Sequence, residues 1–171
     1  MKNTLKLFGI IVLVAVIGLS MVACSDDGGG GSGADSALNG TWVNSTDWTE
    51  KMVLNNGNIS LWDGSIEIAK GTYSTSGNIF TMTFTQVVAS LFGSDGVALL
   101  GLSPSKWYTK QELRTAYVNA MVALGYTQAA AEADFDGTIA DMFTHKATYS
   151  VSGGTLTLID EDGDTAVWTK Q

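Results

Sequence analysis

The chain has 171 residues with 9 basic and 17 acidic side chains, and its net charge at pH 7 is −8. Nucleic acids and anionic membranes attract basic proteins, so we expect no nucleic-acid partner. A single cysteine excludes an intramolecular disulfide framework, and the length suits one folded domain behind a leader segment.

Residues 1–23 have the pattern of a bacterial export signal. Lys2 and Lys6 give a positive start, and an uncharged, mostly apolar run follows over residues 7–19. A membrane-spanning helix needs about 20 apolar residues, whereas a signal peptide uses a shorter run. The pattern therefore predicts a cleaved signal peptide, with an uncleaved anchor as the less favoured alternative.

Met21-Val22-Ala23-Cys24 follows the apolar run and resembles the bacterial lipobox. The resemblance implies cleavage before Cys24 and attachment of a diacylglycerol and an N-acyl chain, palmitate or a similar fatty acid, to that cysteine. About two acyl chains suffice for stable anchoring. We therefore expect a lipoprotein held at a membrane surface of the cell envelope, on the outer membrane or the cell surface if the cell has two membranes.

Residues 24–37 are rich in Gly, Asp and Ser and contain almost no apolar side chains. Such a segment cannot bury enough surface to order itself. We predict a flexible tether that lets a domain over residues 38–171 stand clear of the membrane.

The domain is predicted to begin and end with short β-strands. Apolar residues alternate with threonines at Phe80, Met82 and Phe84, which is the period-two pattern of a half-buried strand. Asn56-Gly57 is a strong hairpin signal because a type I′ turn needs positive φ. The predicted strands cover residues 40–44, 49–54, 58–62, 65–73, 78–85, 145–152, 155–160 and 164–170.

Residues 87–143 interrupt the strand pattern with helix signals. Thr109 and Glu112 form a capping box, in which the threonine caps the helix and the glutamate reaches back to it. A second helix is predicted to start at Thr127. We expect a helical hairpin inserted into the middle of the β-structure, while the apolar stretch ahead of it carries no clear assignment.

Two features of the strands resemble lipocalins. Gly40-Thr41-Trp42 looks like the G-x-W motif of their first strand, and the similar hairpins at 71–83 and 147–159 look like those of small bacterial lipocalin-like lipoprotein domains. The resemblance implies a mainly β fold, an antiparallel up-and-down eight-stranded barrel. It also implies that Trp42 plugs the barrel and that Lys170 replaces the basic residue that packs over this tryptophan. Such a barrel is just wide enough for a filled core or one small ligand.

The lipocalin-like barrel implies a site for one small hydrophobic ligand. Inward positions of the strands are the candidate lining residues, and Trp107 and Tyr108 are candidate mouth residues if the helical hairpin is a lid. The alternative is plain core packing, which would make the protein a non-enzymatic interaction module with a filled barrel: an adhesin, an assembly factor or an inhibitor. The candidate lining residues are Met52, Leu54, Ile66, Ile68, Phe80, Met82, Phe84, Leu156 and Leu158.

No pattern indicates catalysis or metal binding. His145 is the single histidine, so neither a histidine metal site nor a Ser-His-Asp triad has support. The acidic segment 160–164 has glycine in its fourth position, whereas an EF-hand loop needs it in the sixth, and we interpret the segment as a hairpin turn. We expect no enzyme activity, no catalytic residue, no metal and no cofactor.

Overall fold

The computed structural model describes residues 33–171. The signal peptide predicted over residues 1–23 and the acylation site predicted at Cys24 lie outside the described residues. In the part of the chain that the structure describes, no helix is long and apolar enough to span a membrane.

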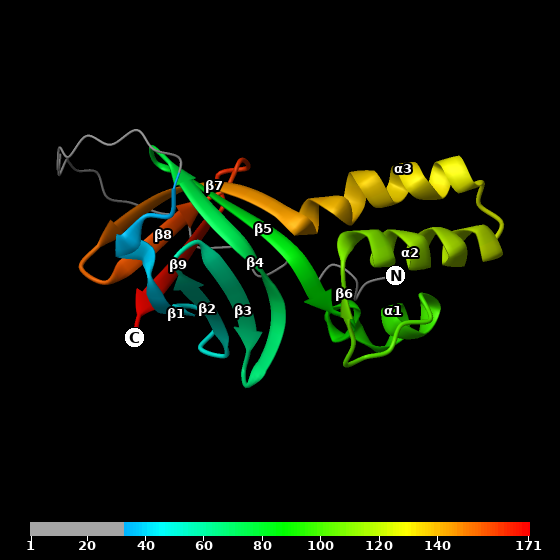
Figure 1. Cartoon of the computed structure of the whole chain (residues 1–171), viewed down its shortest axis with the longest axis horizontal. Helices are drawn as coiled ribbons and strands as arrows, with labels where there is room; N and C mark the ends of the chain where they lie inside the picture. The colour runs from blue at the N-terminus through cyan, green and yellow to red at the C-terminus, as the bar shows by residue number, and fades with distance from the viewer. Residues whose placement is uncertain (1–32) are drawn as a thin grey trace.

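A closed antiparallel barrel forms the larger part of the structure (Figure 1). Each of its strands pairs with the next along the chain, and β9 pairs with β1 to close the ring. The predicted eight-stranded up-and-down barrel is therefore confirmed. Its strands are β1 (Gly40–Asn44), β2 (Glu50–Asn55), β3 (Asn58–Asp63), β4 (Ile66–Ser76), β5 (Ile79–Val88), β7 (Thr144–Ser152), β8 (Thr155–Ile159) and β9 (Thr165–Lys170).

The hairpin between β2 and β3 shows why these strands could be predicted from the sequence. Asn56 and Gly57 have φ angles of 47° and 85°, which is the left-handed conformation that a type I′ turn requires at both central positions. The turn fixes the pairing of Asn55 with Asn58 and of Leu54 with Ile59. Leu54 and Ile59 are both buried, so turn chemistry and apolar alternation specify the same register.

Trp42 closes one end of the barrel, as the resemblance to lipocalins implied. Its indole is fully buried, and Nε1 donates a 2.7 Å hydrogen bond to the Leu38 carbonyl in the short 3-10 helix η1 (Ser36–Leu38). The ammonium group of Lys170 lies 5.1 Å from the centroid of a Trp42 ring. Gly40 has φ of 139°, and a Cβ there would lie 2.7 Å from Lys170 Cε, so the glycine makes room for this lysine.

The last residues of the predicted tether lie against this closed end instead of forming a free coil. Gly33 forms an isolated antiparallel bridge with Thr75 of β4. The carboxylate of Asp35 caps η1 and accepts a 3.0 Å hydrogen bond from the Tyr149 hydroxyl. Composition did not reveal these contacts because they depend on partners far away in the sequence.

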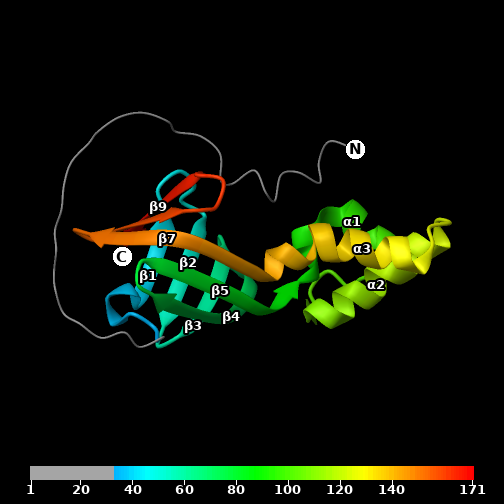
Figure 2. The same ribbon diagram turned by 90° about the horizontal axis from the view of Figure 1, so that it is seen from above.

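Residues 89–143, which we call the helical module, connect β5 to β7 and stand to one side of the barrel (Figure 2). The predicted capping box is present, with Thr109 accepting from the Glu112 amide and Glu112 accepting from the Thr109 amide. Thr127 caps the second helix as predicted. The module contains η2 (Ala89–Phe92), α1 (Gly93–Leu99), β6 (Trp107–Tyr108), α2 (Lys110–Ala123), α3 (Gln128–Thr138) and η3 (Ala140–Phe143).

The two long helices of the module hold each other by packing and by surface ion pairs. Tyr117 of α2 and Phe135 of α3 have ring centroids 5.8 Å apart, and Phe135 is fully buried. Arg114 lies 3.3 Å from both Glu132 and Asp136 on the facing helix. The predicted helical hairpin is thus an antiparallel pair with its own apolar contacts.

Candidate functional site

A cavity of about 320 Å³ lies inside the barrel at the end where β5 leaves it and β7 returns. We call this the open end. Leu91 of η2 and Met142 of η3 border the cavity from the helical module. Small-ligand pockets occupy about 300–1,000 Å³ and are mainly apolar, so this cavity suits a small molecule. Its main apolar lining residues from the barrel are Met52, Leu61, Ile68, Met82, Phe84 and Leu158.

A packed floor separates the cavity from the closed end. Phe80 is fully buried, and its ring centroid lies 5.5 Å from that of Tyr73 and 6.2 Å from that of Tyr149. Leu156 is also fully buried and does not border the cavity. The barrel is therefore filled in its closed half and empty of protein atoms in part of its open half.

The structure brings some of the predicted lining residues together at the cavity and leaves others elsewhere. Met82, Phe84 and Leu158 line it, whereas Phe80 and Leu156 form part of the floor. Strand alternation identifies which residues of a strand face the barrel interior, but it does not give their depth along the barrel axis.

Ile66 and Ile68 were predicted to share the inward face of one strand, but the structure separates them. A register shift in the pairing of β3 with β4 lies between Leu61 and Trp62. Ile68 lines the cavity, whereas Ile66 is 59% exposed at the end of the strand. A bulge adds an unpaired residue and breaks the period-two rule on which the prediction depended.

Trp107 and Tyr108 lie outside the cavity lining. Both belong to β6, which pairs with Val87 and Val88 at the end of β5. The Lys70 ammonium lies 4.4 Å from the Trp107 ring centroid. The Tyr108 hydroxyl accepts a 2.9 Å hydrogen bond from the Ser103 amide. These aromatic residues join the helical module to the barrel, and the mouth is instead bordered by Leu91 and Met142.

The rim of the open end is acidic. Asn44 is 3% exposed, and its Nδ2 donates a 2.7 Å hydrogen bond to Glu50 Oε2. Burial raises the pKa of Glu50, the hydrogen bond from Asn44 opposes the rise, and the negative charges of Asp47 and Asp63 add to it. Glu50 is thus a carboxyl group whose charged form is poorly solvated.

Trp168 contributes a polar atom without a partner. Its Nε1 is buried and has no hydrogen-bond partner, and the residue borders the cavity. Trp168 lies opposite Asn44 of β1 and Leu156 of β8 in the sheet. Buried donors in native structures nearly always have a partner, so this unpaired indole N–H is an exception in the wall of the cavity.

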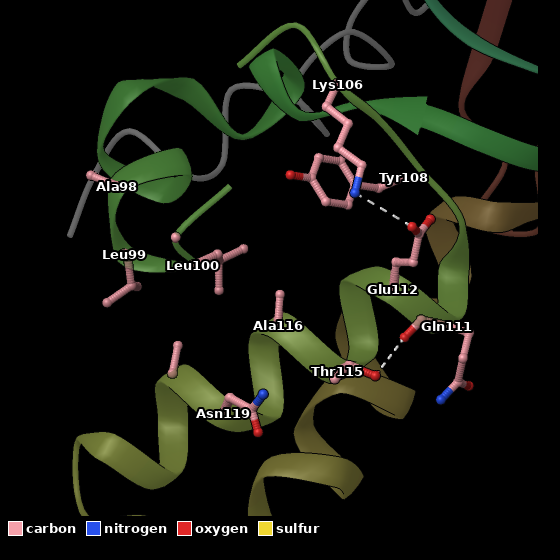
Figure 3. Close-up of a pocket in the computed structure, with 12 residues that line it drawn as sticks. Ala98, Leu99, Leu100, Lys106, Tyr108, Gln111, Glu112, Thr115, Ala116 and Asn119 are labelled. Atoms are coloured by element: carbon pink, nitrogen blue, oxygen red, sulfur yellow. Dashed lines mark hydrogen bonds and ion pairs between the residues drawn. The ribbon is translucent and has the colours of Figure 1, made fainter. Parts of the chain in front are cut away.

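The helical module carries a second concavity, a groove of about 700 Å³ between α1 and α2. Figure 3 shows Leu99 and Leu100 on one side and Ala116 and Asn119 on the other, with the Lys106 to Glu112 ion pair at one end. The groove lies on the surface, and Leu99 is 50% exposed. A small ligand there would remain largely in water, so the barrel cavity is the stronger candidate site.

The acidic segment that follows β8 forms a turn. The Asp160 carboxylate accepts hydrogen bonds from the amides of Asp162 and Asp164, at 3.0 and 2.8 Å. Within residues 33–171, no group of three or more His, Cys, Asp and Glu side chains is arranged to hold a metal ion.

Some site residues escaped the sequence analysis although a signal for them exists. Glu50 and Asp63 continue the inward rows of Met52 and Leu61 by two residues, and extending the alternation to the strand ends would have found them. Leu91 and Met142 carry no such signal because they border the cavity only through the placement of the helical module.

Comparison with family models, with curated proteins and with solved structures finds no match to this chain. The fold and the cavity are therefore interpreted from their own geometry.

Proposed function

We propose that this protein is a lipoprotein of the cell envelope whose barrel binds one small, mainly apolar ligand. The observation that carries the proposal is the cavity of about 320 Å³ above a packed floor of aromatic and aliphatic side chains. Burying apolar surface contributes about 25 cal/mol per Å², and a preformed cavity allows this gain with little rearrangement of the protein. The role is capture or carriage of the ligand, without chemical conversion.

The ligand proposal is tested by filling the cavity. Ala166 borders it and Val167, the next residue of β9, points to the other face of the strand. Native mass spectrometry and thermal shifts across a panel of lipids and small apolar molecules should detect ligands for the wild type. Ala166→Leu should abolish them, and Val167→Leu should retain them. No copurified ligand and no thermal shift with any panel member would overturn the proposal.

The anchoring part of the proposal depends on Cys24 and its lipobox-like context. Cells fed a labelled fatty acid should incorporate the label into the wild-type chain, which should fractionate with membranes. Cys24→Ser should remove the label and release the protein from the membrane fraction. Equal labelling of both proteins would contradict acylation at this residue.

A protein-interaction role is the second candidate, and exposed apolar side chains on the helical module favour it. Leu124 and Tyr126 in the loop between α2 and α3 are 61% and 58% exposed. Sedimentation of the wild type and of Leu124→Glu tests whether this loop binds a second copy of the chain. Concentration-dependent association that the substitution removes would support this role, and a monomer at all concentrations would exclude self-association.

A further inference from the structure

The inward-facing rows of the barrel change from apolar to acidic at the open end. Glu50 is two residues from Met52 on β2, and Asp63 is two residues from Leu61 on β3, so each carboxylate shares the inward face of its apolar neighbour. The same two-residue spacing separates Asp160 from Leu158 of β8 and Asp164 from Ala166 of β9. The four carboxylates that border the cavity are Glu50, Asp63, Asp160 and Asp164.

The two lysines that border the cavity do not neutralise this rim, and the remaining basic residue of the lining, His145, pairs with Met82 on the inward side of β7. Lys51 and Lys146 border the cavity but occupy the alternate positions of β2 and β7, which place them on the outer face of the barrel. The basic partners of the ion pairs within residues 33–171 are Lys106 and Arg114, and both belong to the helical module. The open end therefore keeps an unbalanced negative charge around an apolar cavity.

Two polar groups of this end remain incompletely satisfied. The Glu50 carboxylate accepts one hydrogen bond, from Asn44, and burial disfavours its charge. The Trp168 Nε1–H is buried without an acceptor. A protonated amine in the cavity would compensate the charge of the Glu50 carboxylate.

We propose that the occupant of the cavity is a small cationic amphiphile. Its apolar chain fills the space beside Met82 and Phe84, and its protonated amine lies among the rim carboxylates. This inference rests on the proposed ligand-binding function and specifies its chemical class. The negative rim also disfavours fatty acids, because a carboxylate head would meet like charges.

The test compares three ligands that share one chain and differ in head group: octylamine, octanol and octanoate. Isothermal titration calorimetry at pH 7 uses the chain from residue 24 onward with Cys24→Ser, which retains every described residue. We expect octylamine to bind about tenfold more tightly than octanol, and octanoate to bind most weakly. Equal affinities for octylamine and octanol would overturn the inference.

Variants identify the carboxylates that carry this selectivity. Glu50→Gln and Asp63→Asn should each lower the affinity for octylamine several-fold and leave the affinity for octanol unchanged. Glu50→Gln keeps an acceptor oxygen for the hydrogen bond from Asn44. Glu161→Gln is the matched control, because Glu161 is exposed at the same end and does not border the cavity. An equal loss of octylamine affinity in the control would show that the net charge of the protein, and not the rim, attracts the amine. The inference would then fail.

The outcomes separate this inference from the proposed function. If octanol and octylamine bind equally and Ala166→Leu abolishes both, the cavity binds ligands but is not selective for amines, and only the inference fails. If none of the three ligands binds and the wider panel also fails, both the inference and the proposed function are wrong.

Discussion

The two ends of the barrel each contain an inward-facing tryptophan, and the environments of the two indoles differ. Trp42 is fully buried at the closed end, with its Nε1 bonded to Leu38 and Lys170 packed over its ring. Trp168 at the open end borders a cavity, and its buried Nε1 has no partner. One end is built for stability and the other retains unsatisfied groups, as ligand sites commonly do.

The largest contrast is expected between two neighbouring inward residues of β5. Phe80→Ala removes a fully buried ring from the floor and should lower the free energy of unfolding by about 3–5 kcal/mol. Met82→Ala removes a partly buried side chain beside an existing cavity and should cost about 1–2 kcal/mol. Urea denaturation measures both. Equal costs would show that the two halves are packed alike.

The tryptophans themselves give the next largest difference. Trp42→Phe loses the hydrogen bond to the Leu38 carbonyl and leaves space in a packed core, so it should cost about 1–3 kcal/mol. Trp168→Phe loses no hydrogen bond, and the unfolding free energy should change by no more than about 0.5 kcal/mol. Thermal and urea denaturation of both variants test this. A larger loss at Trp168 would reveal an unrecognised structural role for its indole.

The lysine over Trp42 should make a smaller contribution. Lys170→Met removes the ammonium group from the indole face and from the Ala37 carbonyl, 3.2 Å away, and should cost about 0.5–1 kcal/mol. Lys146→Met is the control, because that lysine is exposed on the outer face of the barrel. The expected result is a lower midpoint of urea unfolding for the first variant alone. Equal shifts would attribute the effect to net charge.

The smallest effect is expected for a substitution of Glu50, which should raise the free energy of unfolding instead of lowering it. Because burial raises the pKa of Glu50 in the folded protein, the folded state binds its proton more tightly than the unfolded state. The resulting penalty is present above the raised pKa and disappears as the pH falls below the ordinary value of 4.5. Glu50→Gln should therefore stabilise the protein at pH 7 by at most about 0.5 kcal/mol, since solvent screens this partly exposed group.

The pH dependence provides the check on Glu50. Unfolding free energies of the wild type and of Glu50→Gln should converge as the pH falls from 7 to about 4, because the wild-type carboxyl group becomes neutral. A difference that stays constant over this range would show that the effect of the substitution is not electrostatic.

Much of the secondary structure was predictable because local chemistry specifies it. The Asn56-Gly57 turn adopts the positive φ angles that a type I′ hairpin demands. Thr109 and Glu112 make the reciprocal hydrogen bonds of a capping box. Leu156 and Leu158 both face inward, as the alternation with threonine predicted.

The site was only partly predictable. Met82, Phe84 and Leu158 line the cavity as predicted, but Trp107 and Tyr108 belong to the helical module and pair with the end of β5 outside the cavity. The latter prediction depended on where an inserted segment packs, and no local pattern encodes that. The bulge that separates Ile66 from Ile68 likewise depends on how β3 and β4 pair.

The sequence by itself determined the eight barrel strands, their hairpin turns, the caps of the two long helices and the inward side of most of these strands, because these features depend on neighbours a few residues apart. The tertiary structure alone decided how deep each inward residue lies and where the barrel interior stays unfilled. It also decided that Trp42 finds a hydrogen-bond partner while Trp168 does not. Cavities and unpaired atoms arise from the packing of distant segments, so they become visible only when the barrel has closed.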